Sequence, residues 1–253
     1  MITIIDKSKC CGCTACFSIC PKHCVEMKMD EEGFFYPFVN GNICIECGLC
    51  EKVCPILNPI PKHKFDVRAF AFQSKDERIR KDSSSGGAFT IIAEKIISDG
   101  GYVYGCEFDD DFDVIHNCAE NIEELGKFRG SKYVQSKLDN VFIEIKKKLD
   151  DKKIVLFSGT PCQVSGLKCY LRKQYDNLFL IDLVCHGIPN PPLIRRDMGY
   201  PPAPHGRCQK AGRDRQCHWK IRRGAGSSRL PTHTRHSGSL LPSSRCPHAS
   251  ASE

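Results

Sequence analysis

Between residues 67 and 184, segments with a strand-like pattern of hydrophobic and polar positions alternate with segments that have a helical pattern. Short apolar runs bounded by charged residues or glycine predict strands, and runs with an apolar residue every three or four positions predict amphipathic helices. Strand, helix and strand follow one another from residue 153 to 184, which predicts two parallel strands with a right-handed crossover. The pattern therefore predicts an α/β domain with a mixed or parallel sheet. The predicted strands are 67–73, 102–108, 112–118, 153–157 and 178–184, and the predicted helices are 89–97, 139–149 and 161–173.

The first 58 residues have a different pattern, in which cysteine spacing takes the place of apolar periodicity. A short apolar strand is predicted at residues 2–5 and an aromatic strand at residues 34–37. The run Cys-x-x-Cys-x-x-Cys-x-x-x-Cys-Pro occurs twice, and its prolines lack an N–H and should end a short helix. This is the bacterial ferredoxin pattern, so we expect an α+β ferredoxin-like domain that binds two [4Fe–4S] clusters.

The same spacing assigns cysteines to clusters. Three thiolates on one tight loop bind one cluster, and the fourth cysteine of that run binds the other cluster. Disulfides or structural zinc are the alternative interpretations, but zinc takes four ligands and favours paired Cys-x-x-Cys units. Two neighbouring cysteines, Cys11 and Cys24, are interpreted as packing thiols, with a ligand role as the alternative. The predicted ligand sets are Cys10, Cys13, Cys16 and Cys54 for the first cluster, and Cys44, Cys47, Cys50 and Cys20 for the second.

Prolines mark the predicted domain boundary. Pro55, Pro59 and Pro61 lie close together, and proline at this density forms a semi-stiff spacer. The end of the chain is rich in Pro, Arg and Ser and has no apolar periodicity, which is typical of a disordered tail. A change of reading frame near residues 195–200 is one hypothesis for its origin. We predict a ferredoxin domain at 1–58, a linker at 59–66, an α/β domain at 67–197 and a disordered tail at 198–253.

The net charge of +7 arises in that tail. Residues 198–253 hold ten Lys/Arg and two Asp/Glu, whereas residues 1–197 hold 27 Lys/Arg and 28 Asp/Glu. The near-neutral remainder predicts no nucleic-acid partner. Iron–sulfur spacing among the 18 cysteines favours a reducing compartment. The first residues have no apolar region long enough for a signal peptide, and no apolar stretch is long enough for a membrane span. We therefore expect a cytoplasmic protein.

Two predicted strand ends carry reactive side chains. Cys162 follows the strand at 153–157 and begins a helix, and Cys185 and His186 follow the strand at 178–184. The carboxyl ends of parallel strands meet at one edge of a sheet, where open α/β sheets bind ligands, and a helix N-terminus lowers the pKa of a thiol. We therefore assign these three residues as candidate catalytic residues lining a redox or cofactor site. Two structural cysteines and a core histidine are the alternative.

A second candidate contact precedes the helix at 89–97. Residues 83–87 read Ser-Ser-Ser-Gly-Gly, and serines of this kind are expected to cap the helix. The N–H groups at a helix N-terminus can bind the phosphate of a cofactor. Plain capping with tight helix packing is the alternative.

Four blocks, in order, resemble the coenzyme F420 hydrogenase/dehydrogenase beta-subunit family. They are SSSGG at 83–87, GSKYVQS at 130–136, FSGTPCQ at 157–163 and DLVCHG at 182–187. The cysteine runs are similar to those of members with a fused ferredoxin domain, and the resemblance covers residues 1–197. It implies an iron–sulfur flavoprotein that binds FAD and passes electrons to an acceptor, which is coenzyme F420 in some members. The cofactor-binding residues that it implies are Ser85, Gly86, Gly87, Lys132, Gly159 and Thr160.

We therefore expect an oxidoreductase subunit that relays electrons through two [4Fe–4S] clusters to a flavin or deazaflavin-type acceptor. Its expected partners are a redox partner protein or subunit and a small-molecule electron acceptor. Two alternatives remain open from the sequence. One is a non-catalytic, ferredoxin-like electron carrier, and the other is a truncated and inactive product.

Overall fold

A computed structural model describes residues 1–4, 6–61 and 68–188 of the 253-residue chain. The predicted tail at 198–253 lies outside the described residues, as does residue range 62–66 of the predicted linker. Within the described residues, no helix is long and apolar enough to cross a membrane.

The front of the chain, residues 1–58, folds as a small α+β head. Strands β1 (Val25–Met29) and β2 (Phe35–Val39) form an antiparallel hairpin. The predicted aromatic strand is confirmed as β2, whereas its partner β1 was missed. Residues 2–4 form no strand, because Ile2 is buried in the core of the head and its N–H donates to the Cys50 Sγ at 3.3 Å. The helices of the head are η1 (Lys7–Lys9), α1 (Ala15–Ile19) and α2 (Leu49–Lys52).

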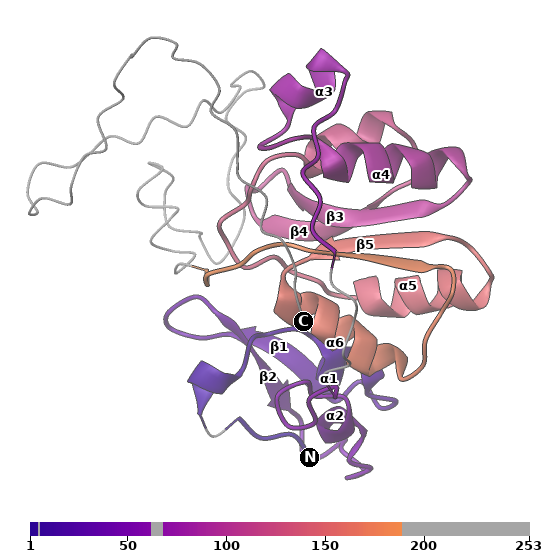
Figure 1. Ribbon diagram of the computed structural model, residues 1–253. Helices are drawn as coiled ribbons and strands as arrows, with labels where there is room; N and C mark the ends of the chain where they lie inside the picture. Colours follow the sequence, from indigo (N-terminus) through magenta and orange to yellow (C-terminus); the bar gives the residue numbers. More distant parts are fainter. Residues whose placement is uncertain (5, 62–67, 189–253) are drawn as a thin grey trace, which may run out of the picture. The chain divides into compact units, whose positions relative to one another are not determined.

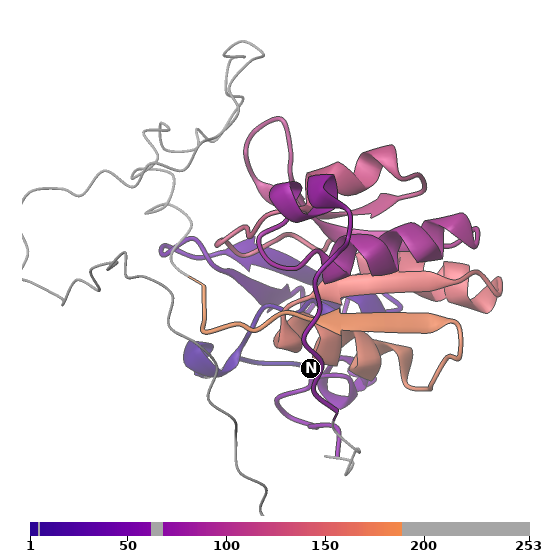
Figure 2. The same cartoon turned by 45° about the horizontal axis from the view of Figure 1, so that its top comes forward.

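A four-stranded sheet in the order β4-β3-β5-β6 forms the centre of the second part. β3 (Tyr102–Phe108) and β4 (Val114–Ala119) are antiparallel, whereas β5 (Val155–Gly159) is parallel to both β3 and β6 (Leu178–Asp182). Figure 2 shows β5 and β6, in salmon and orange, running side by side in one direction. All five residues of β5 are buried, as expected for a central parallel strand. The predicted mixed sheet is confirmed.

Helices cover both faces of this sheet (Figure 1). α4 (Ala88–Ser98) packs on one face, and α5 (Val141–Asp150) and α6 (Pro161–Leu171) pack on the other. The apolar residues of α5 recur at helical spacing, so they form one buried stripe. The connections contain α3 (Glu77–Asp82) and the 3-10 helix η2 (Glu123–Phe128).

Three local predictions were wrong. Residues 68–73 form no strand, and the side chain of Phe70 is 84% exposed, because alternation alone cannot make a strand without a neighbour to pair with. No serine side chain caps α4 either. Its N-cap is Gly87, which has a φ of 83°, a left-handed conformation that glycine adopts without strain. The helix predicted to begin at residue 139 also begins later, since the N-cap of α5 is Asn140.

The head and α6 share one hydrophobic core. Cys13, Ala15 and Val53 from the head pack with Val164 and Leu167 from α6, and α1 lies against α6. This packing places the first cysteine loop of the head beside the helix that follows β5. The domain boundaries at residues 58 and 67 stay a prediction.

Candidate functional site

The two cysteine runs fold into loops with the same backbone. In the first loop Gly12 and Thr14 have φ values of 62° and 63°, and the equivalent residues of the second loop, Glu46 and Gly48, have values of 53° and 71°. A left-handed conformation is costly for Thr14 and Glu46, and such strain clusters at binding sites. Turns that contain left-handed residues direct backbone N–H groups into a concavity suited to anionic groups, including iron–sulfur clusters. The repeat in sequence is therefore a repeat in backbone conformation.

The first predicted ligand set surrounds one cavity. Cys10, Cys13, Cys16 and Cys54 line a space of about 340 Å³, which we call the first cysteine cavity. Burial raises the pKa of Cys10 and raises that of Cys16 to about 12. These thiols are therefore protonated without a bound cation, and binding iron would release their protons.

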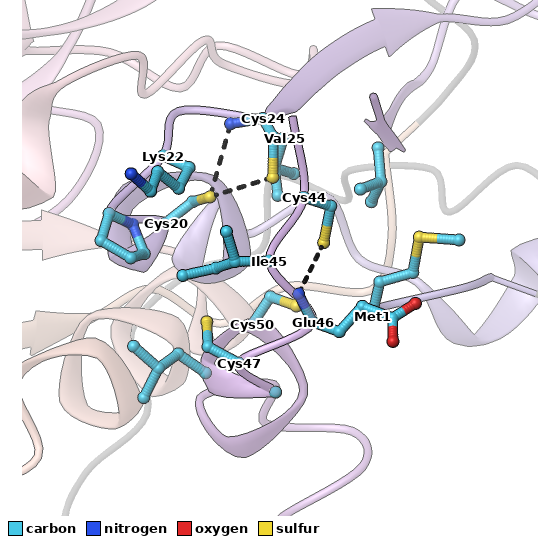
Figure 3. Close-up of a pocket in the computed structure, with 14 residues that line it drawn as sticks. Met1, Cys20, Lys22, Cys24, Val25, Cys44, Ile45, Glu46, Cys47 and Cys50 are labelled. Carbon is cyan, nitrogen blue, oxygen red and sulfur yellow. Dashed lines mark hydrogen bonds between the residues drawn. The ribbon is translucent and has the colours of Figure 1, made fainter. Parts of the chain in front are cut away.

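The second predicted ligand set surrounds another cavity, the second cysteine cavity (Figure 3). The sulfurs of Cys20, Cys44, Cys47 and Cys50 point toward its interior, around the side chain of Ile45. The space is about 20 Å³, close to that of a single water molecule, so a cluster would push these sulfurs outward. A backbone group also contacts this ligand set, because the Glu46 N–H donates a hydrogen bond of 3.4 Å to the Cys44 Sγ.

Cys24 also lines the second cysteine cavity. Its Sγ lies 3.3 Å from the Sγ of Cys20, and its backbone N–H donates to the same sulfur at 3.4 Å. Burial of Cys20 opposes ionisation, but these hydrogen bonds outweigh burial and lower the pKa of Cys20. The hydrogen bond to Cys20 raises the pKa of Cys24 to about 12. Of the two neighbours, Cys20 is therefore the better thiolate donor.

Each cavity is lined by five cysteines, namely the four predicted ligands and one neighbour, Cys11 in the first cavity and Cys24 in the second. Four thiols are the donor set of a [4Fe–4S] cluster, so the residues fit that group. The structure groups the eight cysteines as the spacing does, and their role as ligands stays a prediction. In the part of the chain that the structure describes, no three His, Cys, Asp or Glu side chains are placed to share a single metal ion.

A third cavity, of about 620 Å³, lies where β5 and β6 end and where α4 and α6 begin. We call it the sheet-edge cavity. Its volume falls in the range of roughly 300–1,000 Å³ that is usual for small-molecule sites. Seven of the nine residues predicted to be catalytic or cofactor-binding line it, namely Ser85, Gly87, Lys132, Gly159, Thr160, Cys185 and His186.

Gly86 and Cys162 do not line the sheet-edge cavity. Gly86 packs against the backbone carbonyl of Phe72, and its own carbonyl accepts a hydrogen bond of 2.7 Å from Ser74. The Sγ of Cys162 lies 3.1 Å from the Oγ1 of Thr160, and the same thiol interacts with Cys11 of the head. The hydrogen bond to Cys11 and burial raise the pKa of Cys162, so the expected lowering by the helix N-terminus was wrong.

The first turn of α6 forms part of the cavity wall. Thr160 and Gln163 form a capping box, in which the Gln163 Oε1 accepts the Thr160 N–H at 3.0 Å. The Gln163 Nε2 donates to the Ser136 Oγ at 2.7 Å, and Ser136 belongs to the loop of residues 129–136 that lines the same cavity. This polar contact holds the loop and the helix together.

Lys132 holds that loop from within. Its Nζ donates to the backbone carbonyls of Lys127 and Arg129, both at 2.8 Å. Burial lowers the pKa of Lys132. The side chain thus fixes the shape of the loop and brings a cation to the cavity wall.

His116 is a cavity-lining residue that the sequence did not reveal. It lies in β4, its side chain is stacked on Phe157, and its Nε2 lies 3.1 Å from the carbonyl oxygen of Ser158. A carbonyl only accepts, so Nε2 carries the proton, and Nδ1 is buried without a hydrogen-bond partner among the described residues. Burial lowers the pKa of His116 to about 4. One histidine in an apolar strand gives no motif that could have identified it.

Comparison with known proteins gives one match to a protein family, at the front of the chain. Residues 9–57 match the family of 4Fe-4S dicluster domains. Over 194 residues the chain is 24% identical to a subunit of the F(420)H(2) dehydrogenase of Methanosarcina mazei, an alignment that covers 72% of this chain and 54% of the relative. The chain therefore spans about half the length of that relative.

Other similarities cover smaller parts. The VorC subunit of the ketoisovalerate oxidoreductase of Methanothermobacter marburgensis is 34% identical over 62 residues, which are 24% of this chain and 78% of VorC. Among solved structures, a chain of the F420-reducing [NiFe] hydrogenase complex from Methanosarcina barkeri is 20% identical, with a TM-score of 0.40. That superposition covers 49% of this chain and 46% of the other.

Proposed function

We propose that this chain, which begins with a 4Fe-4S dicluster domain and is similar to a subunit of the F(420)H(2) dehydrogenase, is an electron-transfer subunit of an oxidoreductase. In this proposal it relays electrons through two [4Fe–4S] clusters to a flavin or deazaflavin-type acceptor. The observation that carries the proposal is the grouping of the eight predicted ligands around two cavities, with all four members of a predicted set lining the same cavity.

The head would hold the clusters through these thiolates. A bound [4Fe–4S] cluster supplies one-electron transfer at a potential set by hydrogen bonds to its sulfurs and by exposure to water. The N–H groups of Ile2 and Glu46 donate to the sulfurs of Cys50 and Cys44, so they would stabilise the negative charge of the reduced state. Cys47 is exposed and would make the second site accessible to a redox partner.

The sheet-edge cavity would hold FAD. A flavin supplies the conversion between one-electron and two-electron transfer. The first turn of α4 leaves backbone N–H groups without intrahelical acceptors, and these can bind a phosphate beside Ser85 and Gly87. Lys132 adds positive charge at the same wall. Apolar and aromatic side chains such as Phe89 and Phe128 would exclude water from the ring system.

Several relatives are named as subunits of oxidoreductases, which supports a partner subunit for this chain as well. A second candidate is a ferredoxin-like electron carrier without a flavin. It is supported by the match to VorC, which is confined to 62 residues. The flavin content of the purified protein distinguishes the two candidates, because only the first requires a bound flavin.

The test is purification of the full chain under anaerobic conditions, with iron, sulfide and flavin measured on the same sample. We expect about eight irons and about eight sulfides per chain, together with one flavin. Electron paramagnetic resonance of the dithionite-reduced sample should show two interacting clusters.

Two results would decide against parts of this proposal. About four irons or fewer per chain, or zinc in their place, would remove the electron relay. Two clusters without flavin, even after incubation with FAD, would leave the electron carrier as the function.

A further inference from the structure

The two ligand sets differ in what packs against them. Both cysteine cavities are lined by residues of the head alone, between residues 2 and 57 for the first cavity and between residues 1 and 50 for the second. The first cysteine loop, residues 10–13, packs against α6, and the first turn of α6 lines the sheet-edge cavity. The first ligand set is therefore the one in contact with the element that reaches the proposed cofactor site.

The contact is closest between Gly166 and Cys13. A Cβ placed on Gly166 would lie 2.8 Å from the Cβ and 2.9 Å from the Sγ of Cys13. Cys13 is buried in the core that the head shares with α6, together with Val164 and Leu167. The space between α6 and this predicted cluster ligand is therefore too small for a methyl group.

The same face of α6 carries two cysteines. Cys162 lies four residues before Gly166 and Cys169 three residues after it, so all three lie on one side of the helix. The thiol of Cys162 interacts with Cys11 and lies 3.1 Å from the Thr160 Oγ1, and Cys169 packs against the shared core. Small side chains along this face let the first cysteine loop approach the helix closely.

A second element of the cavity wall touches the same loop. Gln135 belongs to the loop of residues 129–136, and its Oε1 accepts a hydrogen bond of 3.0 Å from the Phe35 N–H. Its Nε2 lies directly over Gly12, where a Cβ would collide with it. Both α6 and this loop thus connect the first ligand set to the sheet-edge cavity.

We propose that Gly166 is a positioning residue that seats Cys13 against α6 and so makes the first cluster the one adjacent to the sheet-edge cavity. The second cluster is then the remote one. This inference rests on the proposed function, because it requires that both ligand sets bind clusters. A methyl group at position 166 would push Cys13 and α6 apart and admit water to the first cluster. Water and altered hydrogen bonding at the sulfurs change a cluster's potential.

The experiment uses the full chain in two backgrounds that each keep one ligand set. Cys47→Ala leaves the first set intact, and Cys10→Ala leaves the second set intact. Gly166→Ala is introduced into each background, and iron content, the resonance spectrum of the reduced cluster and its reduction potential are measured anaerobically. Gly126→Ala is the matched control, because a Cβ at Gly126 meets no atom within 4 Å.

We expect Gly166→Ala to shift the potential and spectrum, or to remove the iron, in the background with the first set alone. The background with the second set and both Gly126→Ala proteins should be unchanged. An unchanged first cluster, or an equal change in both backgrounds, would overturn the inference. Cys162→Ala removes the contacts of this thiol with Cys11 and with the Thr160 hydroxyl without adding volume, and of the two clusters it should affect only the first. If neither background binds iron before Gly166 is changed, the proposed function fails and the inference fails with it.

Discussion

The side-chain amide of Gln163 donates a hydrogen bond of 2.7 Å to the hydroxyl of Ser136, and this bond joins the start of α6 to the loop of residues 129–136. Both residues line the sheet-edge cavity. Gln163 is 7% exposed, so its amide has little access to water and depends on these partners. The contact therefore fixes two walls of the proposed cofactor site relative to each other.

Gln163→Leu should loosen this junction. The variant loses the bond to Ser136 and the capping box with Thr160, and we expect the free energy of unfolding to fall by about 1–3 kcal/mol. Bound flavin should decrease as well. Urea denaturation and the flavin content of the purified chain measure the two effects. Ser136→Ala is the control, since it removes a single hydrogen bond and should cost about 1 kcal/mol. An equal cost for both variants would contradict the role given to the capping box.

His116 should make the stability of the chain depend on pH. Its pKa is about 4 in the folded chain, against about 6.5 in an unfolded one. Between these values the unfolded chain binds a proton that the folded chain does not, so lowering the pH through this window destabilises the fold. From pH 7 to pH 5 this group should contribute a loss of about 2 kcal/mol.

The measurement is urea denaturation at both pH values for the wild type and for His116→Phe. The loss between pH 7 and pH 5 should be smaller in the variant by about 2 kcal/mol. His116→Asn removes the titrating group while keeping an N–H for the Ser158 carbonyl, and it should reduce the pH dependence to the same extent. If both variants kept the dependence of the wild type, another group would be its cause.

Cys20 and Cys24 should differ as ligands although their sulfurs are neighbours. Cys20→Ala should lower the iron content from about eight to about four per chain, whereas Cys24→Ala should leave it near eight. The reason is that hydrogen bonds from Cys24 lower the pKa of Cys20, while the pKa of Cys24 rises to about 12. Iron analysis of anaerobically reconstituted variants tests this. If Cys24→Ala lost iron and Cys20→Ala kept it, Cys24 would be the fourth ligand of the second cluster.

The two cysteines at the ends of β5 and β6 should react at different rates. Cys185 is exposed, whereas Cys162 is half-buried and its pKa is raised, and the thiolate is the form that reacts. We expect iodoacetamide at pH 7.5 to label Cys185 first, as followed by peptide mass spectrometry. Cys11→Ala should speed the labelling of Cys162, because the hydrogen bond to Cys11 is the main cause of its raised pKa. Faster labelling of Cys162 in the wild type would contradict this account.

Apolar periodicity was sufficient to predict a helix or strand wherever the pattern of apolar residues is compatible with a single type of element. The buried run at Val155–Gly159 could only be a central strand, and the apolar stripe at Val141–Asp150 could only be an amphipathic helix. It failed at residues 68–73, where alternating residues have no strand beside them. It also missed Val25–Met29, because a half-exposed strand with charged residues has a weak apolar signal.

The sequence by itself predicted the two ligand sets and determined the order of strands and helices in the sheet. It also predicted a sheet edge shared by Cys162, Cys185 and His186, of which Cys185 and His186 line the sheet-edge cavity. Spacing along the chain is enough for these features, because loop geometry and right-handed crossovers leave few alternatives. The tertiary structure alone decided that Cys162 faces Cys11, that Gly166 lies against Cys13 and that His116 enters the cavity wall. These contacts join residues more than 40 positions apart, and their form depends on how the head packs on α6 and how β4 pairs with β3.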